Sequence, residues 1–196
     1  MTERLPGLLP GQLDAAQHAL YSAIAGSPRV ASPGRAPLRD EQGRLAGPFN
    51  ALLYSPRIGD AVQQLGTAVR YGSALTPRAK ELAILEVAWY HNSDYEWATH
   101  VVAGQDAGLS SEEIAAIRAG SDAATFEPGE RAVCRAVRSL LRDRDLPDPV
   151  YDQARDILGE PVLVELIVLV GYYELLALLL RVARTRAPSA APGGLT

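Results

Sequence analysis

The sequence has little sulfur and no excess of positive charge. Its 196 residues include a single cysteine, Cys134, so neither an intramolecular disulfide nor a Cys-x-x-Cys pair can form within one chain. Dithiol redox chemistry within one chain is thereby excluded. Lysine and arginine number 19 against 23 aspartate and glutamate residues, and no basic run occurs. A chain with a net charge of -4 lacks the positive field that holds a polyphosphate, and we expect no nucleic-acid partner.

The chain also lacks a secretory signal pattern and an uninterrupted membrane-spanning run. Glutamate and proline stand among the first residues, where such a signal needs a continuous apolar segment, so we expect a cytoplasmic protein. The most apolar stretch, residues 162–182, is long enough to cross a bilayer, but Glu165 and Glu174 lie inside it. Each would cost about 2.5–3.5 kcal/mol at mid-membrane. We predict a core or subunit-interface helix and no membrane contact.

Runs of alternating β-branched residues are missing as well, whereas helix signals recur along the chain. Capping residues and first-turn prolines predict helices that begin near Ser55, Thr76, Ser110, Pro128, Asp148 and Pro161. We therefore predict an all-α fold, with one helical domain over residues 1–184 that includes an N-terminal helix and a long loop at 27–47. Residues 185–196 have nothing to bury and are predicted to form a disordered tail. In the helix after Ser55, an apolar stripe is formed by Ile58, Val62, Leu65 and Val69.

Residues 81–100 concentrate the side chains that carry chemistry. Glu96 and His100 are four residues apart on a predicted helix, so their side chains share one face. A carboxylate that accepts from one imidazole nitrogen fixes the tautomer and leaves the other nitrogen able to exchange a proton near neutral pH. Glu81, on the preceding helix, is a possible third member. The alternative is an ordinary surface pair worth a few tenths of a kcal/mol.

Two other kinds of chemistry have weaker support. The spacing of His91, Glu96 and His100 matches no recognised ligand pattern, and we expect no metal and no cofactor. Cys134 lies on an apolar stripe without a neighbouring histidine, which is more typical of a small core residue than of a nucleophile.

Several segments together resemble the carboxymuconolactone decarboxylase family, which shares its fold with the alkylhydroperoxidase D-like proteins. They are Gly47-Pro-Phe-Asn-Ala-Leu-Leu-Tyr-Ser-Pro56, the helix that begins with Glu81-Leu-Ala-Ile-Leu, Tyr95-Glu-Trp-Ala-Thr-His100, Ala107-Gly-Leu109 and Ile114. The resemblance covers roughly residues 45–180. It implies an alkylhydroperoxidase D-like helical bundle that assembles into a trimer or a multiple of it, with an active-site cleft near subunit contacts.

The two branches of this family use the helix pair differently. Peroxidase members have a glutamate, a Cys-x-x-Cys pair and then a histidine four residues after the second cysteine. When the histidine is aligned with His100, Glu81 falls on the glutamate, but Ser93 and Glu96 fall on the two cysteines. Without sulfur there is no nucleophile for a peroxide. The decarboxylase branch resembles Glu-x-x-x-His, which Glu96 and His100 match.

The resemblance therefore predicts a cofactor-independent lyase that acts on a small lactone or an enolisable carbonyl acid. We expect His100 to donate or accept the proton. Glu96 would orient the His100 ring, and Glu81 would tune the basicity of that ring or hold a water molecule. The same groups would serve an isomerase, a hydrolase or a cyclase. The rival hypothesis is a non-catalytic helical oligomer that binds a small apolar molecule or acts as a scaffold.

Three further residues are candidates for contact with a substrate. Phe49 and Asn50 follow Gly47-Pro48, where the ring could form an apolar wall and the amide could donate a hydrogen bond; the alternative is a turn whose ring fills the core. Trp97 is the third candidate, with packing as its alternative. Tyr95 projects about 100 degrees away from Glu96 on an ideal helix, so it would share the site only if a neighbouring element wrapped round.

Overall fold

The structure, a computed structural model, describes residues 2–27 and 37–188. The described residues form helices joined by short connections, with one isolated antiparallel bridge between Arg39 and Leu45. The elements are η1 (Pro10–Gln12), α1 (Ala15–Ala25), α2 (Pro48–Leu52), α3 (Pro56–Thr67), η3 (Ala68–Gly72), α4 (Pro77–Tyr90), α5 (Asp94–Asp106), α6 (Ser111–Arg118), α7 (Pro128–Asp143), α8 (Asp148–Leu158) and α9 (Glu160–Ala183). The all-α prediction is confirmed.

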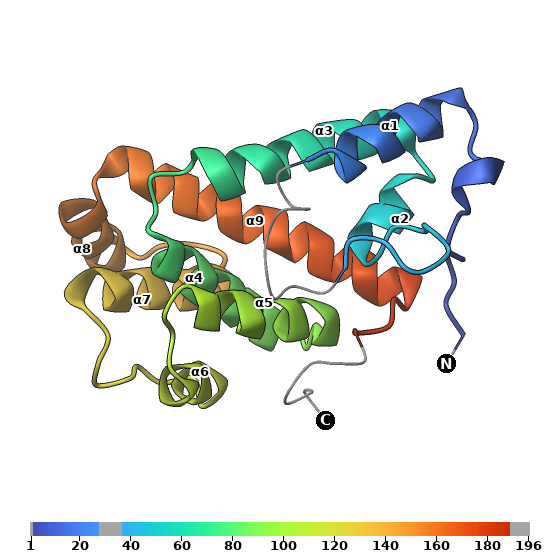
Figure 1. Cartoon of the computed structure of the whole chain (residues 1–196). Helices are drawn as coiled ribbons and strands as arrows, with labels where there is room; N and C mark the ends of the chain where they lie inside the picture. The colour runs from blue at the N-terminus through green and yellow to red at the C-terminus, as the bar shows by residue number, and fades with distance from the viewer. Residues whose placement is uncertain (1, 28–36, 189–196) are drawn as a thin grey trace.

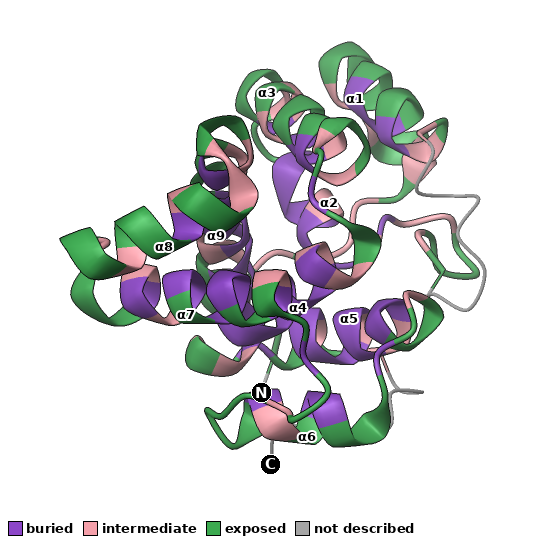
Figure 2. Cartoon of the chain, turned by 90° about the vertical axis from the view of Figure 1, so that its left-hand side faces the viewer, coloured by how far each residue is buried: buried purple, intermediate pink, exposed green. Residues whose placement is uncertain are grey.

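The long helix α9 runs through the middle of the molecule. In Figure 1, α1 and α3 lie along one side of it, and α4, α5 and α7 lie along the other. The largest apolar cluster joins α9 to α4 and α7 through buried side chains such as Leu166, Tyr173, Ala83 and Val137. Figure 2 shows buried residues concentrated on α4, α5 and α7. The α4–α5 hairpin, which carries the candidate site, is therefore held on the central core.

Most predicted helix ends are confirmed, because the capping chemistry is local. The Thr76 side chain accepts a hydrogen bond from the Ala79 amide at the start of α4. Ser110 and Glu113 form the predicted capping box of α6. Gly159 has a φ of +82° and ends α8 in a conformation that favours glycine. These caps need no tertiary contact, which is why the sequence alone predicts them.

Helix α3 differs from the prediction. Only half of its predicted apolar stripe faces the core: Val69 is buried and Val62 packs against the core, whereas Ile58 is 61% exposed and Leu65 is 40% exposed. The buried residues of α3 itself are Gly59, Gln63 and Gly66. At Gly59, an added Cβ would lie 2.5 Å from the backbone oxygen of Leu52, so the small residue lets α3 pack directly on α2.

Two short elements were not predicted. Residues 48–52, expected to be a loop or turn, form the helix α2, and residues 68–72 form a π-helical turn, η3. Such turns contain an extra residue in the helical repeat and often occur at functional sites. Lys80 donates a hydrogen bond to the carbonyl oxygen of Arg70 within this turn at 2.9 Å.

The predicted loop and tail are only partly described. Residues 28–36 and 189–196 lie outside the described residues. Residues 37–47 include the bridge between Arg39 and Leu45, and residues 185–188 follow α9 without helical structure. The assignment of residues 1–184 to one domain stays a prediction.

The two acidic residues of α9 have partners within this chain. Glu165 accepts hydrogen bonds from the Ser73 hydroxyl and the Ala74 amide, each at 2.8 Å. Glu174 contacts His91 at 3.0 Å and also binds Arg144. By length and composition α9 could span a membrane, yet one of its faces is buried in the described core. The hydrogen bonds of Glu165, the ion pairs of Glu174 and this packing explain how an apolar helix accommodates two carboxylates.

Candidate active site

The centre of the candidate site is His100, which lies between two carboxylates. His100 Nδ1 is 2.6 Å from Glu81 Oε2, and His100 Nε2 is 3.2 Å from Glu96 Oε2. Glu81 comes from α4, whereas Glu96 and His100 lie one turn apart on α5. All three side chains are buried. The structure therefore brings together the three residues predicted to be catalytic.

This arrangement limits how protons are distributed. A neutral imidazole has one N–H and can donate only one hydrogen bond, whereas His100 has a carboxylate oxygen at each nitrogen. Either the ring is an imidazolium or one of the two carboxyl groups is protonated. Glu81, Glu96 and His100 together thus hold one proton more than they would with a neutral imidazole and two ionised carboxylates.

The pKa of His100 supports the imidazolium form. Burial by itself lowers the pKa, but the charge of Glu81 and hydrogen bonds to Glu81 and Glu96 outweigh it. The pKa of His100 is raised above its ordinary value of 6.5 as a result. Below that raised pKa, two negative carboxylates face a positive imidazolium.

Arg70 supplies a second positive charge at the same place. It belongs to the π-helical turn, and its Nη2 lies 3.7 Å from Glu81 Oε1. Its Nη1 donates a hydrogen bond to the Tyr173 hydroxyl at 2.7 Å. The ring of Tyr173 stands edge-on to the His100 ring, with centroids 5.2 Å apart. With His100 protonated, two cations balance the two carboxylates.

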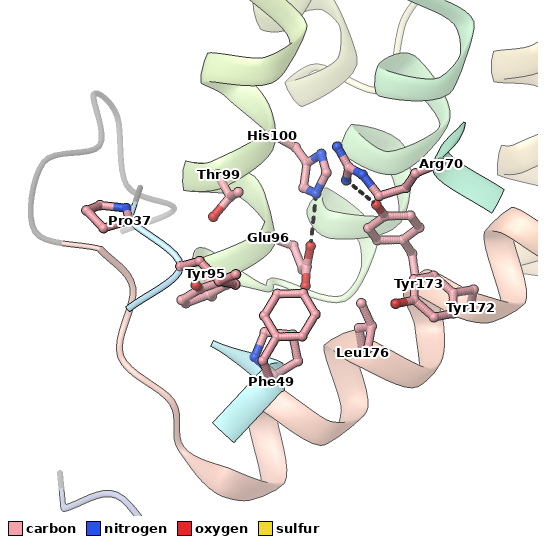
Figure 3. A pocket seen from close by; sticks show the side chains of 12 residues that line it. Pro37, Phe49, Arg70, Tyr95, Glu96, Thr99, His100, Tyr172, Tyr173 and Leu176 are labelled. Carbon is pink, nitrogen blue, oxygen red and sulfur yellow. Dashed lines mark hydrogen bonds and ion pairs between the residues drawn. The ribbon is translucent and has the colours of Figure 1, made fainter. Parts of the chain in front are cut away.

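A cavity of about 80 Å³ opens beside this cluster. Its polar lining comes from Arg70, Glu96, Thr99 and His100, and its aromatic and apolar lining includes Phe49, Tyr95, Tyr172, Tyr173 and Leu176. Figure 3 shows the Phe49 ring next to the Glu96 carboxyl group, with Thr99 and Arg70 on opposite sides of the Glu96–His100 pair. Glu96 and His100 thus both line the cavity, and both His100 nitrogens face carboxylates.

Tyr95 lies in the cavity wall, a position that the sequence allowed only if a neighbouring element wrapped round. The chain before α2 wraps round to meet it: an added Cβ on Gly47 would lie 2.3 Å from Tyr95 Cζ. Gly47 also has a φ of +61°, a conformation that L side chains rarely adopt. Burial, with the nearby charge of Glu96, raises the pKa of Tyr95, so its hydroxyl stays protonated.

Of the three predicted substrate contacts, only Phe49 lines the cavity. Asn50 is turned to the N-terminal segment, where its Oδ1 accepts from the Leu8 amide and its Nδ2 donates to the Pro6 carbonyl. Trp97 is 2% exposed and packs in the core cluster under α4 and α6. Asn50 and Trp97 thus lie outside this cavity. Asn50 lines a neighbouring outer hollow instead, because the position after Phe49 on the short helix α2 points in another direction.

No thiol chemistry reaches the cavity. Cys134 is fully buried in the cluster that contains Trp97, and burial raises its pKa, so the thiolate is disfavoured. Ser93, which aligns with a peroxidase cysteine, is the buried residue before α5 and does not line the cavity. Among residues 2–27 and 37–188, no group of three or more His, Cys, Asp or Glu side chains is placed so that it could hold a metal ion.

Arg70, Thr99 and Tyr173 belong to the site but were not predicted. Arg70 lies at the end of a helix whose repeat changes at residue 68, and a regular helical pattern cannot reveal such a change. Tyr173 stands within an apolar helix, where an aromatic residue usually indicates core packing. Thr99 adjoins His100, and only the cavity distinguishes it from an ordinary helical threonine.

Comparison with known proteins agrees with this fold. Residues 56–139 match the carboxymuconolactone decarboxylase family, a stretch that contains Glu81, Glu96 and His100. A crystal structure from Agrobacterium tumefaciens, described as a protein of unknown function and an AhpD candidate in antioxidant defence, is similar. It is 20% identical, with a TM-score of 0.65, and the match covers 71% of this chain and 96% of that one. No curated protein matches the chain.

The chain therefore resembles the carboxymuconolactone decarboxylase family over residues 56–139, as the sequence motifs indicated. Its fold is that of the AhpD-like helical proteins. This family includes both decarboxylases and peroxidases.

Proposed function

We propose that this protein is a cofactor-independent acid–base enzyme that transfers a proton at a carbon next to a carbonyl group. Its substrate is a small lactone or enolisable carbonyl acid, and decarboxylation is the leading reaction. The observation that carries the proposal is the position of His100 between Glu81 and Glu96 at the wall of a cavity. A surface pair would not need three buried ionisable groups.

Glu96 is the group that exchanges the proton with the substrate. As a base, its carboxylate takes the proton from carbon, and the electron pair of the C–H bond passes into the carbonyl to give an enolate. In decarboxylation, the electron pair of the bond to the departing carboxylate makes the same enolate, and carbon dioxide leaves. The protonated Glu96 then delivers its proton to carbon.

His100 and Glu81 prepare Glu96 for this exchange. The Nε2 proton of His100 can pass to Glu96 over 3.2 Å, and Glu81 stabilises the imidazolium from the other side at 2.6 Å. His100 is thus a proton relay behind Glu96. This refines the expectation from sequence, in which His100 met the substrate and Glu96 oriented it.

The proposal also excludes a Cys-x-x-Cys peroxidase mechanism. With one buried cysteine whose pKa is raised, the chain offers neither a thiolate at the cavity nor a second sulfur. The carboxylate of Glu96 stands where the family's peroxidases have a cysteine.

Proton exchange with solvent tests the proposal without knowledge of the natural substrate. Small oxo acids and lactones in D₂O should gain deuterium at the carbon next to the carbonyl faster with the protein than without it. Glu96→Gln and His100→Gln should slow this exchange by about 10²- to 10⁴-fold. His18→Gln, at an exposed histidine on α1, should leave it unchanged. Equal rates in all variants would favour the rival function of a binding protein or scaffold.

We further propose that the chain forms a homo-oligomer through the outer face of α9. The exposed apolar residues there are Val164, Ile167, Val168, Leu175, Leu178 and Val182. A hollow lined by Leu65, Val164 and Val168 joins this face to α3. An exposed apolar area of this kind is typical of an interaction site, and the family resemblance implies trimers.

Sedimentation velocity tests this assembly. Leu178→Glu should convert the oligomer to a monomer, because Leu178 is 63% exposed in the single chain and would be buried in the contact. Ile157→Glu, at an exposed apolar position on α8, is the matched control and should not change the mass. A wild-type monomer at micromolar concentration would contradict the proposal.

A further inference from the structure

Two residues that line the cavity each have a buried polar atom without a hydrogen-bond partner. Arg70 Nε and Thr99 Oγ1 are buried, and neither has a hydrogen-bond partner among the described residues. Both side chains line the cavity beside Glu96. Leaving a buried donor unpaired carries a free-energy cost, so a pair of such donors around one cavity indicates a ligand that accepts from them.

The two donors lie on opposite sides of the acid–base pair. In Figure 3, Arg70 stands on the Tyr173 side of His100, and Thr99 stands on the other side. The other two guanidinium nitrogens of Arg70 are engaged, one with the Tyr173 hydroxyl and one near Glu81, which leaves Nε as its open donor. A ligand that satisfies both sides needs two oxygen functions separated by the carbon that faces Glu96.

The two sides differ in charge. Arg70 carries a positive charge and suits a carboxylate, whereas the neutral hydroxyl of Thr99 suits a carbonyl oxygen. The carboxylates of Glu81 and Glu96 do not leave the pocket negative overall when His100 is protonated, because Arg70 and His100 balance them.

The volume of the cavity limits the size of the ligand. A cavity of about 150 Å³ accepts benzene, and this cavity of about 80 Å³ is close to half that size. A bicyclic or aromatic acid would not fit between Phe49 and Tyr173, which both line the cavity. The comparison favours a short acid, of about four carbon atoms, in the part of the cavity beside Glu96.

From these observations we infer that the site takes a short 3-oxo acid, with its carboxylate on Arg70, its keto oxygen on Thr99 and the carbon between them facing Glu96. This inference rests on the proposed function, since it assigns Glu96 to the reacting carbon. It names a substrate class and two binding residues that the family resemblance did not supply.

Isothermal titration of the full-length protein tests the inference with three probes. Acetoacetate has both oxygen functions, butanoate lacks the keto oxygen, and butanone lacks the carboxylate. Acetoacetate should bind most tightly. Thr99→Val should weaken the binding of acetoacetate about fivefold and leave the binding of butanoate unchanged, because only acetoacetate uses the Thr99 hydroxyl. Arg70→Lys keeps the charge but removes Nε, and should weaken both acids about tenfold or more.

Arg39→Lys, at an exposed arginine in the neighbouring outer hollow, is the control and should bind all three probes as the wild type does. Equal loss of acetoacetate and butanoate in Thr99→Val, or no loss of either, would overturn the inference. So would the absence of acetoacetate binding to the wild type. If Arg70→Lys does not fold, the Thr99→Val comparison decides alone. Because this test measures binding, a negative result leaves deuterium exchange with other carbonyl compounds as a separate test of the proposed function.

Discussion

Nδ1 of His100 and Oε2 of Glu81 are 2.6 Å apart although the two residues come from different helices. This contact ties α5 to α4 at the centre of the site, and the raised pKa of His100 depends on it. The proposed proton transfer and part of the stability of the protein therefore both depend on the contact between Glu81 and His100.

The first prediction concerns the dependence of stability on pH. The pKa of His100 is higher in the folded protein than its ordinary value of 6.5, so protonation of His100 stabilises the fold. This contribution is complete below pH 6.5 and is lost as the pH rises through the raised folded pKa. Urea denaturation of the wild type and of His100→Gln measures it. The difference in unfolding free energy should shrink as the pH rises; a difference that grows would contradict the account.

The second prediction concerns the loss of charge at Glu81. Glu81→Gln leaves the buried cations of Arg70 and His100 with one counter-charge fewer, and breaking a buried pair typically costs about 3–5 kcal/mol. Glu86→Gln is a matched control, because Glu86 is equally buried on the same helix and pairs with Arg138. Both variants should be less stable in urea, but only Glu81→Gln should lower the pKa of His100. An unchanged His100 titration in Glu81→Gln would count against the coupling.

The third prediction concerns Gly47, which packs against Tyr95. Gly47→Ala adds a Cβ that would lie 2.3 Å from Tyr95 Cζ, and it also places alanine at a φ of +61°. At Gly47 the φ of +61° is combined with a ψ of -139°, a backbone conformation that is essentially restricted to glycine and costs another residue about 1–3 kcal/mol, and the contact adds to it. Gly120→Ala is the comparison variant, since Gly120 has a φ of +67° and nothing within 4 Å of an added Cβ, so it lacks the contact. Thermal denaturation should show the larger loss at Gly47.

The fourth prediction concerns the lone thiol. Cys134 is buried and its pKa is raised, so iodoacetamide should not label it in the native protein at pH 8, although it should do so in denaturant. Cys134→Ser should retain the deuterium exchange of the wild type and should show the same lack of thiol peroxidase turnover. Peroxide turnover that disappears in Cys134→Ser would overturn the acid–base proposal.

How far the sequence predicts this structure depends on whether the relevant contact is local. The starts of α4 and α6 follow from Thr76 and Ser110, whose side chains bond to amides three residues away. Glu96 and His100 share a helix face for the same reason. The contact from Glu81 to His100 joins two helices, so the sequence could name Glu81 only as a possible third member, and the family resemblance supported it.

Other parts of the site could not be predicted, since they depend on tertiary packing. Arg70 reaches the cavity because the helical repeat changes to a π turn at residues 68–72. Tyr95 meets the site because the chain at Gly47 wraps round it, as the close approach of the two residues requires. Ile58 fails to face the core because two glycines of α3 allow another face to pack more closely. Neither periodicity nor propensity contains this information.

The most direct test of the central claim is the titration of the His100 ring, followed by ¹⁵N NMR in the wild type and in Glu81→Gln. The account predicts that both ring nitrogens of the wild type carry protons at pH 6.5, and that the midpoint lies above 6.5 and falls in the variant. A neutral wild-type imidazole at that pH, with the same midpoint in Glu81→Gln, would contradict a proton relay held between Glu81 and Glu96.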